Sequence, residues 1–188
     1  MSSTLAPFGF RPSFHDSGNM RAKAYTIASG YATSIFCGDA VKLVDAGVIN
    51  LAAAGDTMLG IFMGCEYKDS LGKPTVSPFW PASTSATDIV AYVIDDPNIV
   101  FEAVYANPGT AGTDSVQTAV GELCDLKAHT TVGSTSTGLS TEYLDVISGG
   151  QFQIVGFSTY PGDSLTDAYV VAKVRMNEQH FHYPTAAI

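Results

Sequence analysis

Short apolar runs separated by turn residues recur along this chain and constrain its fold more than any other feature. The clearest are Ile89–Ile94 and Ile99–Tyr105, which are rich in β-branched and aromatic residues and flank the turn sequence Asp95–Asn98. Pro97 in that turn fixes φ where the chain is expected to reverse. Runs of this length and composition, bounded by turn residues, predict β-strands.

A strict alternation near the C-terminus predicts a strand with one buried face. In the run from Asp167 to Met176, alternate residues from Ala168 onward are apolar, and Lys173 and Arg175 fall on the other face. Side chains of a strand point to opposite faces with a period of two, so this pattern fits a half-buried strand. The preceding run "FQIVGFSTY" predicts a second strand, with a turn at residues 161–166 between the two.

Two hairpins are predicted in the first half of the chain. Ala40–Val44 and Val48–Leu51 are of strand length, and Gly47 can take the positive φ that a tight turn needs. Residues 57–67 and 74–80 form the second pair, and Gly60 and Gly64 within it suit a bulge or a tight corner. About eight to ten strands and no helix are expected, which predicts an all-β fold, either a compact β-barrel or a jelly-roll-like sandwich.

Two segments between the predicted strands are less regular. Residues 115–128 fit a helical face and a strand about equally, and Gly121 favours the strand. Residues 129–150 are rich in Ser, Thr and Gly and predict a long exposed loop.

The two ends of the chain differ from its middle. We expect residues 1–23 to be an extended N-terminal arm, residues 24–176 a β-rich domain that begins with a strand at Ala24–Ile27, and residues 177–188 a C-terminal tail that leaves the domain. Aromatic rings in both ends lie outside the predicted strands and would gain free energy by burial against a partner. Alternatively, both ends fold back and cover open edges of their own sheets. The predicted partner-binding residues are Phe8, Phe10, Arg11, Phe14, Phe181 and Tyr183.

The charge of the chain excludes one class of partner. The net charge is −9, and phosphate binding needs a patch of Lys and Arg, so no nucleic-acid partner is expected. Residues 1–23 carry three basic side chains and one acidic one, while the remainder carries six basic and seventeen acidic. A basic arm of this kind could bind an acidic neighbour. Only 14% of residues are charged, which fits large contacts with partners and fits an ordinary low-charge domain equally well.

The cysteines and the hydropathy indicate where the protein is made. Cys37, Cys65 and Cys124 are far apart and include no C-x-x-C pair, so we expect them to be reduced and buried. No run has the length of a membrane span, and the first residues lack the apolar segment of a secretory signal. These features predict synthesis in a reducing cytoplasm and no membrane partner.

The sequence offers little for catalysis or metal binding. It contains no nucleophile elbow, phosphate-binding loop, dinucleotide fingerprint or zinc-protease motif, so we predict no enzyme and no cofactor. His180 and His182 would share one face of a strand and could bind a metal as in a cupin, but the further ligands of a cupin are missing. Asp95 and Asp96, with Glu66 or Asp69, could bind calcium, although a turn is the stronger interpretation. No metal site is predicted.

Several stretches resemble a known family of viral proteins. They are "APFGFRPSFHDSGN", "AYTIASGYATSIFCGDAVKLV", "GVINLAAAGD", "LGIFMGCEY", "DIVAYVIDDPNIVFEA" and "FQIVGFSTYPGD" with "DAYVVAKVRMNEQHFH". Together they are similar to the capsid decoration, or cement, proteins of tailed bacteriophages. The resemblance implies a non-enzymatic virion protein on the outer surface of the capsid, bound across joints of the major capsid protein. It also implies self-association, with a homotrimer favoured over a homodimer.

A different function remains open from the sequence alone. A virion jelly-roll module that recognises host-surface glycans would use exposed aromatic rings beside Asp and Asn side chains. Trp80 and Tyr105, next to the Asp95–Asn98 turn, are the predicted residues of such a site.

Overall fold

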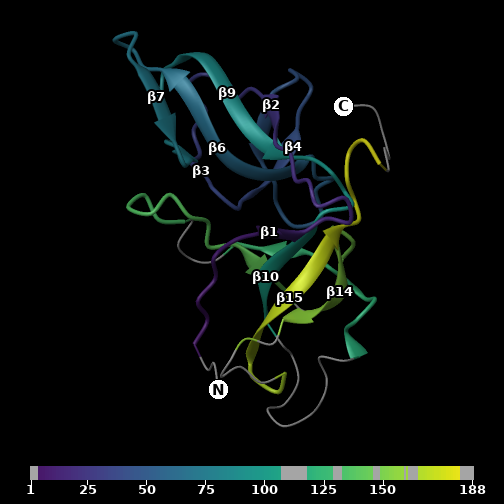
Figure 1. The fold of residues 1–188 in the computed structure, drawn as a ribbon. Coiled ribbons are helices and arrows are strands. Elements are labelled where there is room, and N and C mark those ends of the chain that lie inside the picture. The colour runs from purple at the N-terminus through teal and green to yellow at the C-terminus, as the bar shows by residue number, and fades with distance from the viewer. Residues whose placement is uncertain are drawn as a thin grey trace.

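The computed structural model describes residues 4–106, 118–128, 133–145, 149–158, 160 and 165–182. The fold is all-β, as predicted, and its strands lie in two sheets, one above the other in Figure 1, with a short two-stranded ribbon beside them. The described residues contain fifteen strands, more than the predicted eight to ten because several are only two residues long. In chain order they are β1 (Arg11–Phe14), β2 (Lys23–Tyr25), β3 (Ile35–Phe36), β4 (Ala40–Leu43), β5 (Ile49–Leu51), β6 (Gly60–Lys68), β7 (Pro74–Ser77), β8 (Phe79–Trp80), β9 (Thr87–Ile94), β10 (Val100–Ala106), β11 (Leu123–Cys124), β12 (Leu126–Lys127), β13 (Tyr143–Leu144), β14 (Phe152–Ser158) and β15 (Tyr169–Met176).

The upper sheet is a nearly closed barrel. Its strand order is β2-β9-β6-β4-β5, with β7 added on β6. The two ends of this order meet where the Ile49 N–H donates to the Thr26 carbonyl at 2.9 Å. The interior is filled by the fully buried side chains of Trp80, Phe62 and Ile35. The predicted barrel or sandwich is therefore confirmed.

The lower sheet packs against the outside of the barrel. Its order is β11-β14-β15-β10-β13-β12, with β1 paired to β10. The alternation predicted for β15 is confirmed, because Val170, Ala172, Val174 and Met176 are all buried. They face a second core that includes Ile61 and other residues on the outer face of the barrel.

The predicted hairpins and the predicted bulge are present. β4 pairs with β5 and β6 pairs with β7, each in antiparallel register. At Gly64 φ is +137°, and the pairing of β6 with β9 shifts between Phe62 and Gly64, which is a bulge. Gly60 leaves room for the neighbouring strand, since a Cβ there would overlap the carbonyl of Ile94.

The two clearest predicted strands are confirmed as β9 and β10, but they belong to different sheets. The turn between them includes an Asn98 N–H that donates to the Asp96 carboxylate at 2.9 Å. This turn therefore carries the chain from the barrel to the lower sheet and does not close a hairpin.

The loop predicted for residues 129–150 is wrong over part of its length. Residues 129–132 and 146–148 lie outside the described residues, but Ser140, Glu142 and Leu144 are buried and β13 belongs to the lower sheet. The ambiguous segment contains both kinds of structure where it is described: Thr118 is helical, residues 119–121 form a turn, and the short strands β11 and β12 follow.

Buried amide side chains connect the barrel to the lower sheet. Gln151 is fully buried, and its Nε2 donates to the carbonyls of Ala53 and Asp56, each at 2.8 Å. Its Oε1 accepts a hydrogen bond from the Leu126 N–H at 3.1 Å. A buried amide with all its groups bonded fixes the two sheets relative to each other, because breaking one bond leaves a polar group unpaired.

Candidate partner-binding surface

The first described residues lie across the lower sheet. Phe8, with Thr4 and Ala6, lines a small groove of about 120 Å³ whose other wall includes Val104 and Val171. The Arg11 guanidinium lies 4.5 Å from the centroid of the Phe8 ring, which is a cation–π contact. Phe8 is therefore half-buried on its own domain, while Arg11 remains exposed.

Phe10 is a core residue, so it has no surface with which to bind a partner. Its side chain is 1% exposed and stacks on Phe152 of β14, with the ring centroids 4.3 Å apart. The prediction treated Phe8, Phe10 and Phe14 alike because the segment has no period that separates buried from exposed rings. The structure corrects it, since the backbone at Gly9 turns with φ of +73° and directs the chain into the core.

Phe14 lies at the end of β1 and is 55% exposed. β1 pairs with β10, so this part of the predicted arm is an edge strand of the lower sheet. Pro12 sits within it and has no N–H to offer to an additional strand, which limits edge-to-edge association there.

A buried carboxylate holds β1 on the sheet. Glu102 of β10 is 8% exposed and accepts hydrogen bonds from Ser158 Oγ and Tyr160 Oη, each at 2.7 Å. Burial opposes ionisation, but these bonds and a further one from Ser13 of β1 keep the pKa of Glu102 below its usual value. The arm is thus held on the lower sheet both by the packing of the Phe8 ring and by the hydrogen bond from Ser13 to the Glu102 carboxylate.

The start of the C-terminal tail does not leave the domain. Gln179 is 1% exposed, and its Nε2 donates to the carbonyls of Leu59 and Asp95 at 3.0 and 3.2 Å. Its Oε1 accepts from the N–H groups of Phe181 and His182 at 2.9 and 2.8 Å. The prediction for residues 177–182 is therefore corrected, and this segment covers the barrel. Tyr183 and the rest of the tail lie outside the described residues.

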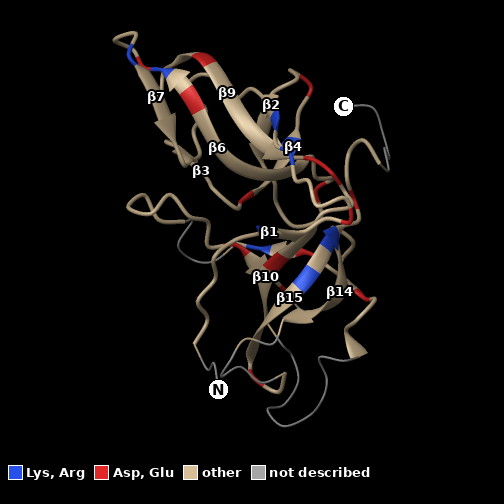
Figure 2. Ribbon diagram, viewed as in Figure 1, with Lys and Arg blue, Asp and Glu red and all other residues tan. Residues whose placement is uncertain are grey.

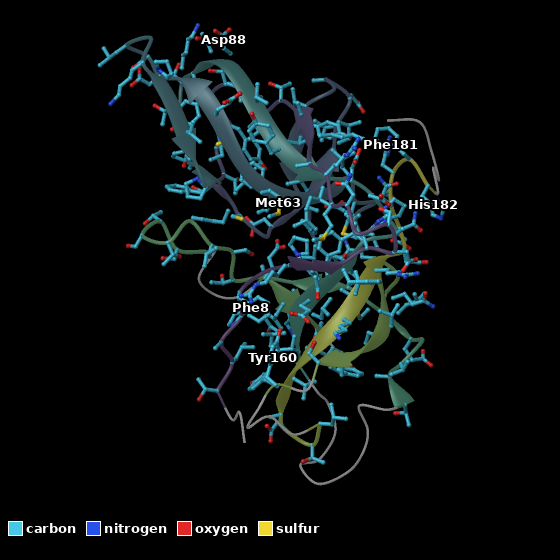
Figure 3. All side chains as sticks on the ribbon, viewed as in Figure 1. Phe8, Met63, Asp88, Tyr160, Phe181 and His182 are labelled. Atoms are coloured by element: carbon cyan, nitrogen blue, oxygen red, sulfur yellow. The ribbon has the colours of Figure 1, made fainter. Side chains whose placement is uncertain are left out.

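The second half of the predicted arm, residues 15–23, and the start of the predicted tail, residues 179–182, line a common cleft of about 540 Å³. Figure 3 places Phe181 and His182 together, well away from Phe8. Phe181, which lines this cleft, is 60% exposed. The residues that line the cleft are His15, Ser17, Asn19, Arg21, Lys23, Asp95, Asp96, Pro97, Gln179, Phe181 and His182.

The charges in the cleft are partly paired. Lys23 Nζ lies 2.8 Å from the Asp95 carboxylate, which also accepts a hydrogen bond from Tyr25 Oη at 2.6 Å. His15 Nε2 lies 3.4 Å from the Asp96 carboxylate. Arg21 is exposed and has no ion-pair partner among the described residues. The cleft therefore offers a guanidinium beside an exposed aromatic ring.

The residues predicted for a glycan-binding site and for a cupin-like metal site are not arranged to form either site. Trp80 and Tyr105 are each 0% exposed, so neither can stack on a glycan. His180 and His182 lie in a turn, where the His182 N–H donates to the Gln179 carbonyl, and they do not share the face of a strand. Within the described part of the chain, no group of three or more His, Cys, Asp or Glu side chains is arranged to hold a metal.

The structure also brings together two carboxyl groups that the sequence does not single out. Asp39, between β3 and β4, and Glu142, before β13, are 2% and 5% exposed and lie in the wall of a cavity of about 490 Å³. They are more than one hundred residues apart in the chain and match no motif. An acidic residue followed by apolar ones in "EYL" is the only sign of a buried carboxylate at Glu142.

The cysteines are free thiols, and Cys65 and Cys124 are buried as predicted, whereas Cys37 is half-buried. Burial raises the pKa of Cys65 to about 12, and burial with the nearby Asp125 raises that of Cys124 to about 12. Neither thiol can supply a thiolate at neutral pH.

Comparison with protein-family models, curated proteins and solved structures finds no significant match to this chain. None of the described residues lies in a helix long and apolar enough to span a membrane.

Proposed function

We propose that this chain is a non-enzymatic capsid decoration protein, which binds the outer surface of a phage head across joints of the major capsid protein and stabilises the shell. The observation that carries the proposal is the cleft between residues 15–23 and residues 179–182, which is lined by the exposed ring of Phe181. The sequence resemblance to decoration proteins supports the same function. Self-association, with a trimer favoured, belongs to the proposal.

The cleft fits an extended acidic segment of the shell protein. A carboxylate of that segment would pair with Arg21, and an apolar side chain would cover Phe181. Most of the ribbon carries no charge, as Figure 2 shows, so large contacts need little desolvation of ions. Several copies bound to neighbouring shell subunits would reinforce one another through effective concentration.

The copy number of the chain in purified particles tests the proposal first. Quantitative mass spectrometry should give a ratio to the major capsid protein near one to one. A handful of copies per particle would contradict decoration and would indicate a portal or tail role instead.

The cleft is tested by binding variants of the full chain to shells that lack it. We expect Phe181→Ser and Arg21→Glu each to weaken binding roughly tenfold or more, because both remove exposed contacts without touching the core. The matched control is Leu71→Ser, since Leu71 is 91% exposed on the turn between β6 and β7, outside the cleft. Equal binding by all three variants would rule the cleft out. Deleting residues 1–21 is not a clean test, because it removes Phe10 from the core.

A further inference from the structure

Asp39 is fixed in the barrel by its own turn. Its Oδ2 accepts a hydrogen bond from the Phe36 N–H at 2.7 Å, and its N–H donates to the Phe36 carbonyl at 2.9 Å. Its carbonyl accepts from the Phe62 N–H of β6, also at 2.9 Å. The carboxyl group therefore cannot turn away from its position without breaking the turn that leads into β4.

Glu142 reaches the same place from the lower sheet. Its Oε2 accepts a hydrogen bond from the Ala40 N–H of β4 at 2.9 Å, so one side chain bridges the two sheets. Its N–H donates to Ser140 Oγ at 3.0 Å, and its carbonyl accepts from the Gly9 N–H at 3.2 Å. Three segments thus meet at Glu142: the N-terminal arm at its main-chain carbonyl, the start of β4 at its carboxylate, and its own chain before β13.

No positive charge balances the pair. Neither carboxyl forms an ion pair within 4 Å in the described part of the chain. The other charged groups that line the adjacent cavity are Lys127 and Asp145, which pair with each other at 2.9 Å. The Cys37 thiol, in the same turn as Asp39, has its pKa raised by burial and by that carboxylate, so it stays neutral.

Two carboxylates so placed cannot both ionise at low cost. Burial raises the pKa of Asp39 to about 6, although hydrogen bonds from Phe36 and Ser140 oppose the rise. Burial and the charge of Asp39 raise the pKa of Glu142 well above its usual value. Adjacent buried carboxyl groups of this kind retain a proton to higher pH than isolated ones.

We propose that Asp39 and Glu142 form a proton-dependent joint between the barrel and the lower sheet, closed while the pair retains a proton and loosened when both groups ionise. The cavity beside the pair gives water a route to it, so ionisation can be followed by hydration. Loosening would separate the β3–β4 turn from the segment before β13, because the bridging bond from Ala40 to Glu142 lies between them.

The sign of the pH dependence follows from the raised pKa values. The folded state binds these protons more tightly than the unfolded chain does, so the stabilisation is fully present below about pH 4. It is lost as pH rises from there through the folded pKa values, about 6 for Asp39 and higher for Glu142, above which the groups are ionised in both states and the loss is complete. The protein should therefore be less stable at pH 8.5 than at pH 5.

The experiment compares melting temperatures of the full chain from pH 4.5 to 8.5. An amide in place of Glu142 mimics the protonated acid, so in Glu142→Gln the loss of melting temperature over this range should be smaller than in the wild type by about 5 °C. Asp39→Asn should behave similarly. The control is Glu122→Gln, which removes an exposed carboxylate and should retain the wild-type profile.

A direct titration completes the test. Carbon-13 NMR of the wild-type carboxyl groups should give at least one midpoint near or above pH 6 in the pair, and hydrogen exchange at the Ala40 amide should accelerate above that midpoint. If both groups titrate near pH 4, or if the Glu142→Gln and wild-type profiles are parallel, the joint does not exist. The titration needs only the wild-type protein, so it decides the matter even if the variants fail to fold.

Discussion

Replacing Phe10 with alanine is expected to lower the free energy of unfolding by about 3–5 kcal/mol, the usual cost of deleting a buried aromatic ring. The ring is 1% exposed and stacks on Phe152, so its loss leaves a cavity between the arm and β14. The Phe10 N–H also donates to the Gly38 carbonyl at 2.8 Å, which holds the backbone in place and limits collapse around the cavity. Urea denaturation of the full chain measures the effect.

The control for this prediction lies four residues along the same segment. Phe14→Ala removes a ring of the same size that is 55% exposed, and we expect a change of within about 0.5 kcal/mol. If the two substitutions cost the same, the first residues of the chain do not pack as described. For binding to shells we expect the opposite order, with Phe14→Ala weakening binding more than Phe10→Ala, because only the Phe14 ring is exposed to a partner.

The strands were predictable because their physics is local. A period of two identifies β15. Gly47 identifies the reversal between β4 and β5, and the turn sequence after β9 identifies the end of that strand. Each signal lies within a window of a few residues. The division into a barrel and a lower sheet was not predictable in this way. It depends on long-range pairings, such as that of Ile49 with Thr26, which no local pattern encodes.

The candidate surface was predictable only in part. Aromatic rings in both ends of the chain were identified, and Phe14 and Phe181 are exposed as a partner-binding role requires. Phe10 could not be distinguished from them, because its burial depends on the close approach at Gly9, where a Cβ would lie 2.5 Å from that of Ser140. Likewise, nothing near Glu142 in the sequence indicates that Asp39 is its neighbour.

The buried amides explain why the C-terminal segment stays on the barrel. Gln179 satisfies two carbonyl groups of the barrel and two N–H groups of its own turn with one side chain. The exposed position of Phe181 follows from this, because the turn that Gln179 closes directs the ring outward beside the cleft. If the cleft binds the shell protein as proposed, stability and binding are coupled at Gln179, which also lines the cleft.

We expect Gln179→Ala to lower the free energy of unfolding by roughly 2–4 kcal/mol, since it leaves buried carbonyl and N–H groups without partners. The same variant should weaken shell binding, because the turn that positions Phe181 is no longer closed. Gln153→Ala is the matched control: Gln153 is exposed, and its Nε2 makes one bond, to the Gly121 carbonyl at 3.2 Å. Denaturation and shell binding measured on both variants give the comparison. An unchanged affinity of Gln179→Ala, at a temperature where it is folded, would show that Phe181 does not need this turn to reach the partner.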